Sequence, residues 1–145
     1  MKIFLILALI ILSIGVHAQT NSTFLRDDDS TKEFKTVQIE AKFPGGIKAW
    51  TNYLQTNLKS ELGAKYLKPK RGETLRQTAI VSFLVDKEGN ISEVQILNPD
   101  EVHSKLAAET IRVIKEGPKW VPAVQNGKKV IYRQKQSVTW EVVRE

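Results

Sequence analysis

The stretch AIVSFLVDKEGNISEVQIL, residues 79–97, determines the fold that the sequence predicts. Residues 79–85 are mostly β-branched, aromatic or apolar on both faces, which is typical of a strand that is covered on both sides. Residues 86–90 read as a turn, in which Gly89 supplies the positive φ angle. Residues 91–97 return as a second strand. The stretch therefore predicts a hairpin whose first strand is covered or central in its sheet.

A helix is predicted before this hairpin, over about residues 46–59. The turn FPGG, residues 43–46, opens it, and the next apolar residues are spaced three and four apart, which places them on one helix face. These residues are Ile47, Trp50, Tyr53, Leu54 and Leu58. Residues 60–76 carry glycine and proline among charged residues, which predicts a long loop between the helix and the hairpin.

A second helix follows the hairpin and runs from near Val102 or Ser104 to Lys115. Its apolar positions again have helical spacing, so one stripe is expected to be buried. This stripe consists of Leu106, Ala107, Thr110, Ile111 and Ile114. Gly117 and Pro118 end the helix, since glycine is favoured directly after a helix and proline just beyond it.

The last predicted element is a long strand over residues 129–143. Apolar residues at 130, 132, 138, 140 and 142 alternate with mostly polar ones, which indicates one buried face and one solvated face. The resulting order is helix, strand, strand, helix, strand. It predicts an α+β fold, a two-layer sandwich in which a small antiparallel sheet of about three strands carries two helices packed on one face.

The segment between the second helix and the last strand contains Trp120 and Pro122. We expect a structural role for both, because a buried indole in a segment that proline keeps extended would fix this connection. The alternative is that Trp120 lies at the surface and contacts a ligand.

The N-terminus has the pattern of an export signal. Lys2 precedes an apolar run, and small residues lie at −3 and −1 of a cleavage site after residue 18, so residues 1–18 are predicted to be a signal peptide. The rival interpretation is an uncleaved membrane anchor, but the run has only fourteen residues and a spanning helix needs about 20. Residues 19–36 are polar and predict a flexible tether. Residues 37–145 are the expected folded domain.

Candidate catalytic and metal-binding residues are few. The predicted mature chain has one histidine, His103, and no cysteine, which falls short of a usual zinc site. Asp100, Glu101 and Ser104 lie near His103, but a triad is assembled in space rather than from consecutive residues. We expect these residues to form a helix start, where acids complement the dipole and Ser or Asp caps it. The sequence predicts no catalysis, no metal and no cofactor.

The positive charge does not indicate nucleic acid as a partner. The formal charge of +6 becomes +5 once Lys2 is removed, and exported proteins rarely meet nucleic acid. Most basic residues are scattered singly among acids, as on a solvated surface.

Three groups of residues, in this order, resemble the C-terminal domain of the TonB family in its short exported variant. They are Phe43-Pro44-Gly45-Gly46, then Val85-Asp86 with Gly89 and Ile91, then Pro118-Lys119-Trp120 with Pro122-Ala123 and Gly127-Lys128. The resemblance covers about residues 39–143. It implies a periplasmic protein-binding module of TonB-dependent transport, whose last strand pairs with the short N-terminal peptide, the TonB box, of an outer-membrane transporter.

The last strand suits this implied role if it lies at a sheet edge, where unpaired N–H and C=O groups can accept another strand. Side chains that would then select the partner are Tyr132, Arg133, Gln134 and Gln136, and a proline at position 134 would remove a ladder donor. The opposing interpretation is an internal or covered strand with merely solvated side chains. Edge position is not visible in sequence, and a strand-exchanged homodimer also stays open.

The sequence departs from a full TonB energy transducer. It lacks the full-length anchor that engages the inner-membrane motor and the long proline-rich spacer. The hypothesis is therefore a periplasmic or secreted binding module that contacts a membrane only if its N-terminal segment is uncleaved. One alternative is a minimal transducer anchored in the inner membrane. A remote alternative is a small cell-envelope hydrolase that depends on His103.

Overall fold

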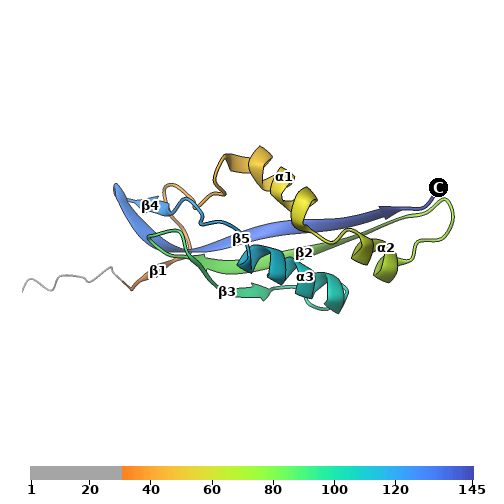
Figure 1. Ribbon diagram of the computed structural model, residues 1–145. Coiled ribbons are helices and arrows are strands. Elements are labelled where there is room, and N and C mark those ends of the chain that lie inside the picture. The colour runs from red at the N-terminus through yellow and green to blue at the C-terminus, as the bar shows by residue number, and fades with distance from the viewer. Residues whose placement is uncertain (1–30) are drawn as a thin grey trace, which may run out of the picture.

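The computed structural model describes residues 31–145 (Figure 1). The predicted signal peptide and most of the predicted tether lie outside the described residues. The elements are β1 (Glu33–Phe34), α1 (Gly46–Asn57), α2 (Glu61–Leu67), β2 (Thr74–Val85), β3 (Ile91–Ile96), α3 (Ser104–Lys115), β4 (Ala123–Gln125) and β5 (Lys128–Val143).

The sheet is built around β2, which pairs antiparallel with β5 on one side and with β3 on the other. The β2–β5 ladder is continuous, from Thr74 opposite Val143 to Val85 opposite Tyr132. This confirms the hairpin of residues 79–97, and of the two positions expected for its first strand, covered or central, the structure shows the central one. The α+β class is confirmed as well, with α1 alongside β5 and α3 alongside β2 and β3 (Figure 1).

The sheet has more strands than predicted, because two short segments join it. β1 pairs in parallel with Ile131 and Tyr132 of β5, although it lies in the segment predicted to be a tether. β4 forms a hairpin with the start of β5 through a turn at residues 126–127. Both are too short to produce a periodic pattern.

A third helix, α2, lies in the segment predicted to be a long loop. Leu62, Tyr66 and Leu67 of this helix pack into a cluster with residues of β2, α3 and β5. β2 also begins earlier than predicted, at Thr74 instead of about residue 78. The expected loop is thus reduced to the short connection between α2 and β2.

The larger hydrophobic cluster is aromatic and lies between α1, the sheet and the segment before β4. Trp120 is 4% exposed and packs edge-on against Phe43, Trp50 and Phe83, with ring centroids 5.0 to 5.8 Å apart. The indole therefore lies in the core, where the structural role expected of it would place it. Aromatic pairs in such tilted arrangements contribute more than the area that they bury.

Candidate functional site

One side of β5 carries backbone groups that the sheet does not use. In β2, the Ile80 N–H donates to Asn98 Oδ1 at 2.8 Å, and the Ile80 carbonyl accepts from the Leu97 N–H at 2.8 Å. Both Ile80 groups therefore point toward β3 and away from β5. In an antiparallel ladder such pairs alternate, so Ser137, which lies opposite Ile80, directs its own N–H and C=O away from β2.

The same alternation applies along the whole of β5 because the β2–β5 register has no shift. Within residues 132–143, which lie opposite β2, even-numbered residues bond to β2, and odd-numbered residues direct their backbone groups to the opposite side. On that side β1 pairs with Ile131 and Tyr132, and among residues 31–145 no strand pairs with the rest. We call the backbone of residues 135–143 on this side the β5 edge.

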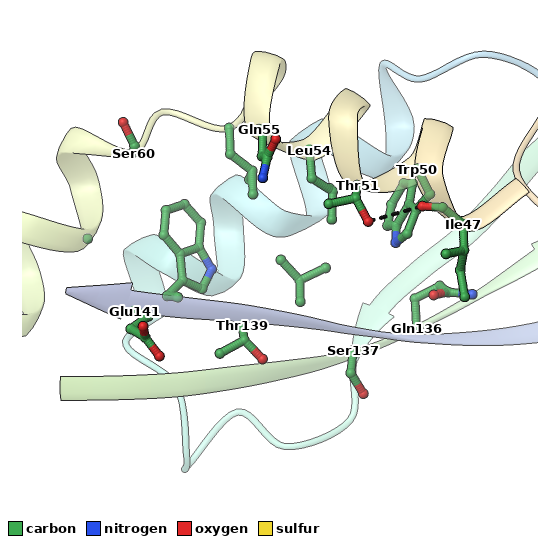
Figure 2. Close-up of a pocket in the computed structure, with 14 residues that line it drawn as sticks. Ile47, Trp50, Thr51, Leu54, Gln55, Ser60, Gln136, Ser137, Thr139 and Glu141 are labelled. Carbon is green, nitrogen blue, oxygen red and sulfur yellow. Dashed lines mark hydrogen bonds between the residues drawn. The ribbon is translucent and has the colours of Figure 1, made fainter. Parts of the chain in front are cut away.

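A groove runs along the β5 edge beneath α1 (Figure 2). Its volume is about 530 Å³, within the range of ligand clefts in proteins. The α1 wall presents apolar and amide side chains that point toward β5 in Figure 2. The wall residues are Ile47, Trp50, Thr51, Leu54 and Gln55, and the β5 side consists of residues 136–141. We call this cleft the α1 groove.

The floor of the α1 groove is packed against α2 and α3. Trp140 is 5% exposed, and its indole Nε1 donates to Thr110 Oγ1 of α3 at 3.2 Å. Val138 is also buried, and α2 approaches through Gly63, where a Cβ atom would lie 3.1 Å from Val142 Cγ2. At the rim, by contrast, Ile47 is 85% exposed.

The four residues predicted to select a partner do not share one surface. Tyr132 and Gln134 are buried on the helix-facing side, and burial raises the pKa of the Tyr132 hydroxyl, with Glu40 nearby adding to the effect. Gln136 is half-buried and lines the α1 groove. Arg133 lies on the opposite face. Their role in partner selection stays a prediction.

Arg133 is held by two carboxylates. It pairs with Glu33 of β1 at 2.7 Å and with Glu93 of β3, and this hydrogen bonding holds the pKa of Glu33 below its ordinary value. Glu93 lies at a β-bulge with φ 50°. The ion pairs hold β1 against the sheet beside the point where the β5 edge begins.

Sequence reasoning missed the α1 wall and the outward backbone of Ser137 and Thr139. The sequence does contain the residues of this wall, because Ile47 belongs to the apolar stripe of the helix. In the structure Ile47 lies outside the core and is free to line the groove. The outward backbone had none, because its direction depends on how β2 pairs with β3.

The residues of the predicted structural motifs surround the aromatic cluster. Phe43 is buried in it, and Gly45 and Gly46 have φ angles of 82° and 77° where α1 begins. Pro122 is half-buried and Pro118 is exposed after α3. The contact between Gly89 and Trp120 joins the hairpin to this cluster.

His103 caps α3. Its Nδ1 accepts from the backbone N–H of Lys105 at 3.2 Å, and its ring stacks on Tyr66 at 4.5 Å. This confirms the predicted helix start, although the cap is His103 itself instead of Ser or Asp, and the first turn contains no acid. Across residues 31–145, no group of His, Cys, Asp or Glu side chains could hold a metal ion. In the same range no helix is long and apolar enough to cross a membrane.

One comparison with known proteins identifies the domain. The family model for the Gram-negative bacterial TonB protein C-terminal matches residues 71–142, from just before β2 to nearly the end of β5. Neither the curated proteins nor the solved structures gave a match. Domains of this family are protein-interaction modules of transport across the cell envelope. Residues 71–142, which include all of the β5 edge except Val143, therefore identify this folded domain as a member of the TonB C-terminal family.

Proposed function

We propose that this protein binds a peptide segment of a transporter or another envelope protein by β-strand addition to the β5 edge. The observation that carries the proposal is the row of outward N–H and C=O groups from Lys135 to Val143, beside a groove. Backbone hydrogen bonds would supply affinity without dependence on sequence, and side chains in the groove would supply selectivity.

β1 supports the proposal from within the chain. Its two residues already occupy this side of β5 at Ile131 and Tyr132, in parallel orientation. The edge is therefore shaped to accept a strand there, and the β5 edge continues in the same line for nine residues, about 30 Å of extended chain. A peptide of seven to nine residues would fill it.

A second copy of this chain is the competing occupant. Two β5 edges that pair antiparallel about Val138 would bring Lys135 of each copy opposite Glu141 of the other, and both side chains are exposed. Opposite charges in directly facing positions favour such a pairing. A dimer of this kind would block the peptide, so peptide binding would weaken as the protein concentration rises.

The location proposed for this activity is the periplasm, after cleavage of residues 1–18. N-terminal sequencing of the exported protein tests it. A first residue of Gln19 supports the free periplasmic module, and an intact N-terminus supports the anchored alternative.

The experiment that tests strand addition compares Ser137→Pro with Ser137→Ala. Proline removes an outward N–H that the sheet does not use, and edge strands tolerate it there, whereas alanine keeps the N–H and removes only the hydroxyl. Binding of TonB-box peptides from transporters of the same cell is measured by calorimetry. We expect Ser137→Ala to bind like the wild type and Ser137→Pro to bind roughly tenfold weaker or not at all. Equal binding by two folded variants would exclude addition at this position.

A further inference from the structure

A second cavity opens on the face of the sheet that α1 and α3 do not cover. Its volume is about 460 Å³, within the range of small-ligand sites in proteins. Unlike the α1 groove, it is lined mainly by charged and polar side chains. These are Glu33, Lys35, Ser82, Gln95, Arg133 and Lys135. We call it the open-face cavity.

The strand register places three polar side chains in one row across this cavity. Ser82 of β2 lies opposite Gln95 of β3 and opposite Lys135 of β5, and directly opposite residues share one face of a sheet. The neighbours of Ser82 in β2, Val81 and Phe83, are fully buried in the core on the helix side. Because successive side chains of a strand alternate, the row of Ser82 points to the other face.

The Ser82 hydroxyl is an unused hydrogen-bonding group at the floor of the cavity. Ser82 is 2% exposed, and within residues 31–145 no side chain or backbone group pairs with its Oγ. The only unpaired side-chain polar atom of those residues that solvent does not reach is Gln134 Oε1, so Ser82 Oγ stays open to the cavity. Buried polar groups are nearly always paired, so this hydroxyl calls for a partner that enters from the cavity.

Cationic groups with unused donors surround the hydroxyl. Lys35 and Lys135 are both exposed, and in the described part of the chain neither forms an ion pair with a carboxylate. Arg133 donates through Nε and Nη2 to Glu33 and through Nη2 to Glu93, and these are its side-chain hydrogen bonds within residues 31–145. The N–H groups of Arg133 Nη1 therefore remain available.

The acids beside the cavity are already occupied. Both carboxylate oxygens of Glu33 accept from Arg133, and Glu93 accepts from the same guanidinium. With Lys35 and Lys135 added to Arg133, the cations outnumber these two acids. The open-face cavity therefore combines a net positive charge with unused donors, which is the environment that an anion requires.

The arrangement of the donors favours a phosphate group over a carboxylate. The donors come from β2, from β3, from β5 and from the residue that follows β1, so they approach the cavity from several sides. A phosphate group has three acceptor oxygens in different directions and a charge between about −1.5 and −2 at pH 7. A carboxylate has a single charge, and it accepts mainly near its own plane.

We propose that the open-face cavity binds a phosphate group. Lys35, Lys135 and Arg133 Nη1 supply charge-assisted hydrogen bonds, and the Ser82 hydroxyl and the Gln95 amide supply neutral ones. The phosphate group belongs either to a soluble phosphate ester or to a phospholipid headgroup, because both present the same chemistry. The site does not depend on strand addition, since it shares no lining residue with the α1 groove.

The test is a titration of the full mature chain with inorganic phosphate at neutral pH and constant ionic strength. NMR follows the side-chain amide of Gln95 and the backbone amides of Ser82 and Lys135, and we expect saturable shifts of these signals. Lys135→Gln should weaken binding roughly three- to tenfold, because one charge-assisted hydrogen bond is lost. Lys129→Gln is the matched control, since it removes the same charge from an exposed β5 lysine outside the cavity, and it should bind like the wild type.

Equal weakening by Lys135→Gln and Lys129→Gln would overturn the proposal, because it would show a diffuse charge effect in place of a site. The absence of saturable shifts would also overturn it. Acetate is the carboxylate probe, and acetate binding as tight as that of phosphate would contradict the choice of a phosphate group.

Two further probes distinguish the sources of the phosphate group. Glycerol phosphate represents a soluble ester, and phosphatidylcholine vesicles that contain phosphatidic acid represent a headgroup. Glycerol phosphate binding that Lys135→Gln weakens supports the soluble source. Vesicle binding that Lys135→Gln weakens and that inorganic phosphate displaces supports the lipid source. If neither probe binds in a manner that depends on Lys135, the proposal is wrong.

Discussion

Gly89 and Trp120 contact each other backbone to backbone, although they lie in a hairpin turn and in the segment before β4. The Trp120 N–H donates to the Gly89 carbonyl at 2.9 Å, and a Cβ atom on Gly89 would lie 2.0 Å from the Trp120 carbonyl oxygen. Gly89 also has φ 85°. The turn therefore does more than reverse the chain, because it also holds the Trp120 backbone beside the aromatic cluster.

Gly89→Ala should destabilise the fold strongly. The substitution combines an unfavourable positive φ with a backbone clash, and we expect a loss of about 3–4 kcal/mol in the free energy of unfolding, measured with urea. Gly72→Ala is the control, since Gly72 has φ 78° but no atom within 4 Å of an added Cβ. It should cost only about 1 kcal/mol. Equal costs for the two variants would show that the contact with Trp120 is unimportant.

Glu109 should make stability depend on pH. It is 6% exposed, pairs with Arg112 and accepts from the Lys59 N–H at 3.0 Å, and these hydrogen bonds hold its pKa below the ordinary value. A lowered folded-state pKa contributes stability that is complete above the unfolded-state value, near 4.3, and is lost as the pH falls through the folded-state value. Glu109→Gln should therefore cost about 1–3 kcal/mol at pH 7 and progressively less as the pH falls below about 5.

The control for this prediction is Glu116→Gln. Glu116 also pairs with Arg112, but it is 61% exposed, so its loss should cost less than about 1 kcal/mol. Urea denaturation of both variants from pH 7 to pH 3 makes the comparison. A Glu109→Gln penalty that stays constant over this range would contradict the assignment of the charge effect to Glu109.

Gln134→Met should leave the fold as stable as the wild type or raise its stability by up to about 1 kcal/mol. The wild type buries Gln134 Oε1 without a donor among the described residues, which costs free energy. An apolar side chain of similar length has no acceptor and avoids this cost. Thermal and urea unfolding measure the change. A loss above about 2 kcal/mol would show that Gln134 has an internal partner and is a structural residue.

The parts of the fold that were predicted correctly have local signals. The hairpin, α1, α3 and β5 show their periods within the sequence, and Gly117-Pro118 marks the end of α3. α2 was not predicted, because Gly63 in its middle is a residue that disfavours helices. The structure gives Gly63 a different reason, since the helix packs so closely on β5 that an added Cβ would lie 3.1 Å from Val142. That contact is invisible without the tertiary fold.

The candidate site was only partly predictable. β5 was predicted, and its alternation already places Gln134 and Gln136 on the apolar face. Only the structure shows that Gln134 is buried there and that Gln136 lines the α1 groove. β1 could not be predicted, because its pairing depends on Arg133, one hundred residues from Glu33. Which N–H groups of β5 point outward could not be predicted either. It depends on the hydrogen bonds that Ile80 of β2 makes to Leu97 and Asn98 after β3. A proline at position 134, suggested by the sequence, would therefore remove a bond to β2 and not one at the β5 edge.

Amide hydrogen exchange along β5 tests the central claim, that this strand has a free edge which a peptide occupies. In the free protein the amides of Lys135, Ser137 and Thr139 should exchange much faster than those of Gln136 and Val138, which bond to β2. Addition of a TonB-box peptide should slow the odd-numbered amides and leave the even-numbered ones unchanged. Equal protection of both sets in the free protein, or unchanged exchange of the odd set when the peptide is bound, would contradict the claim.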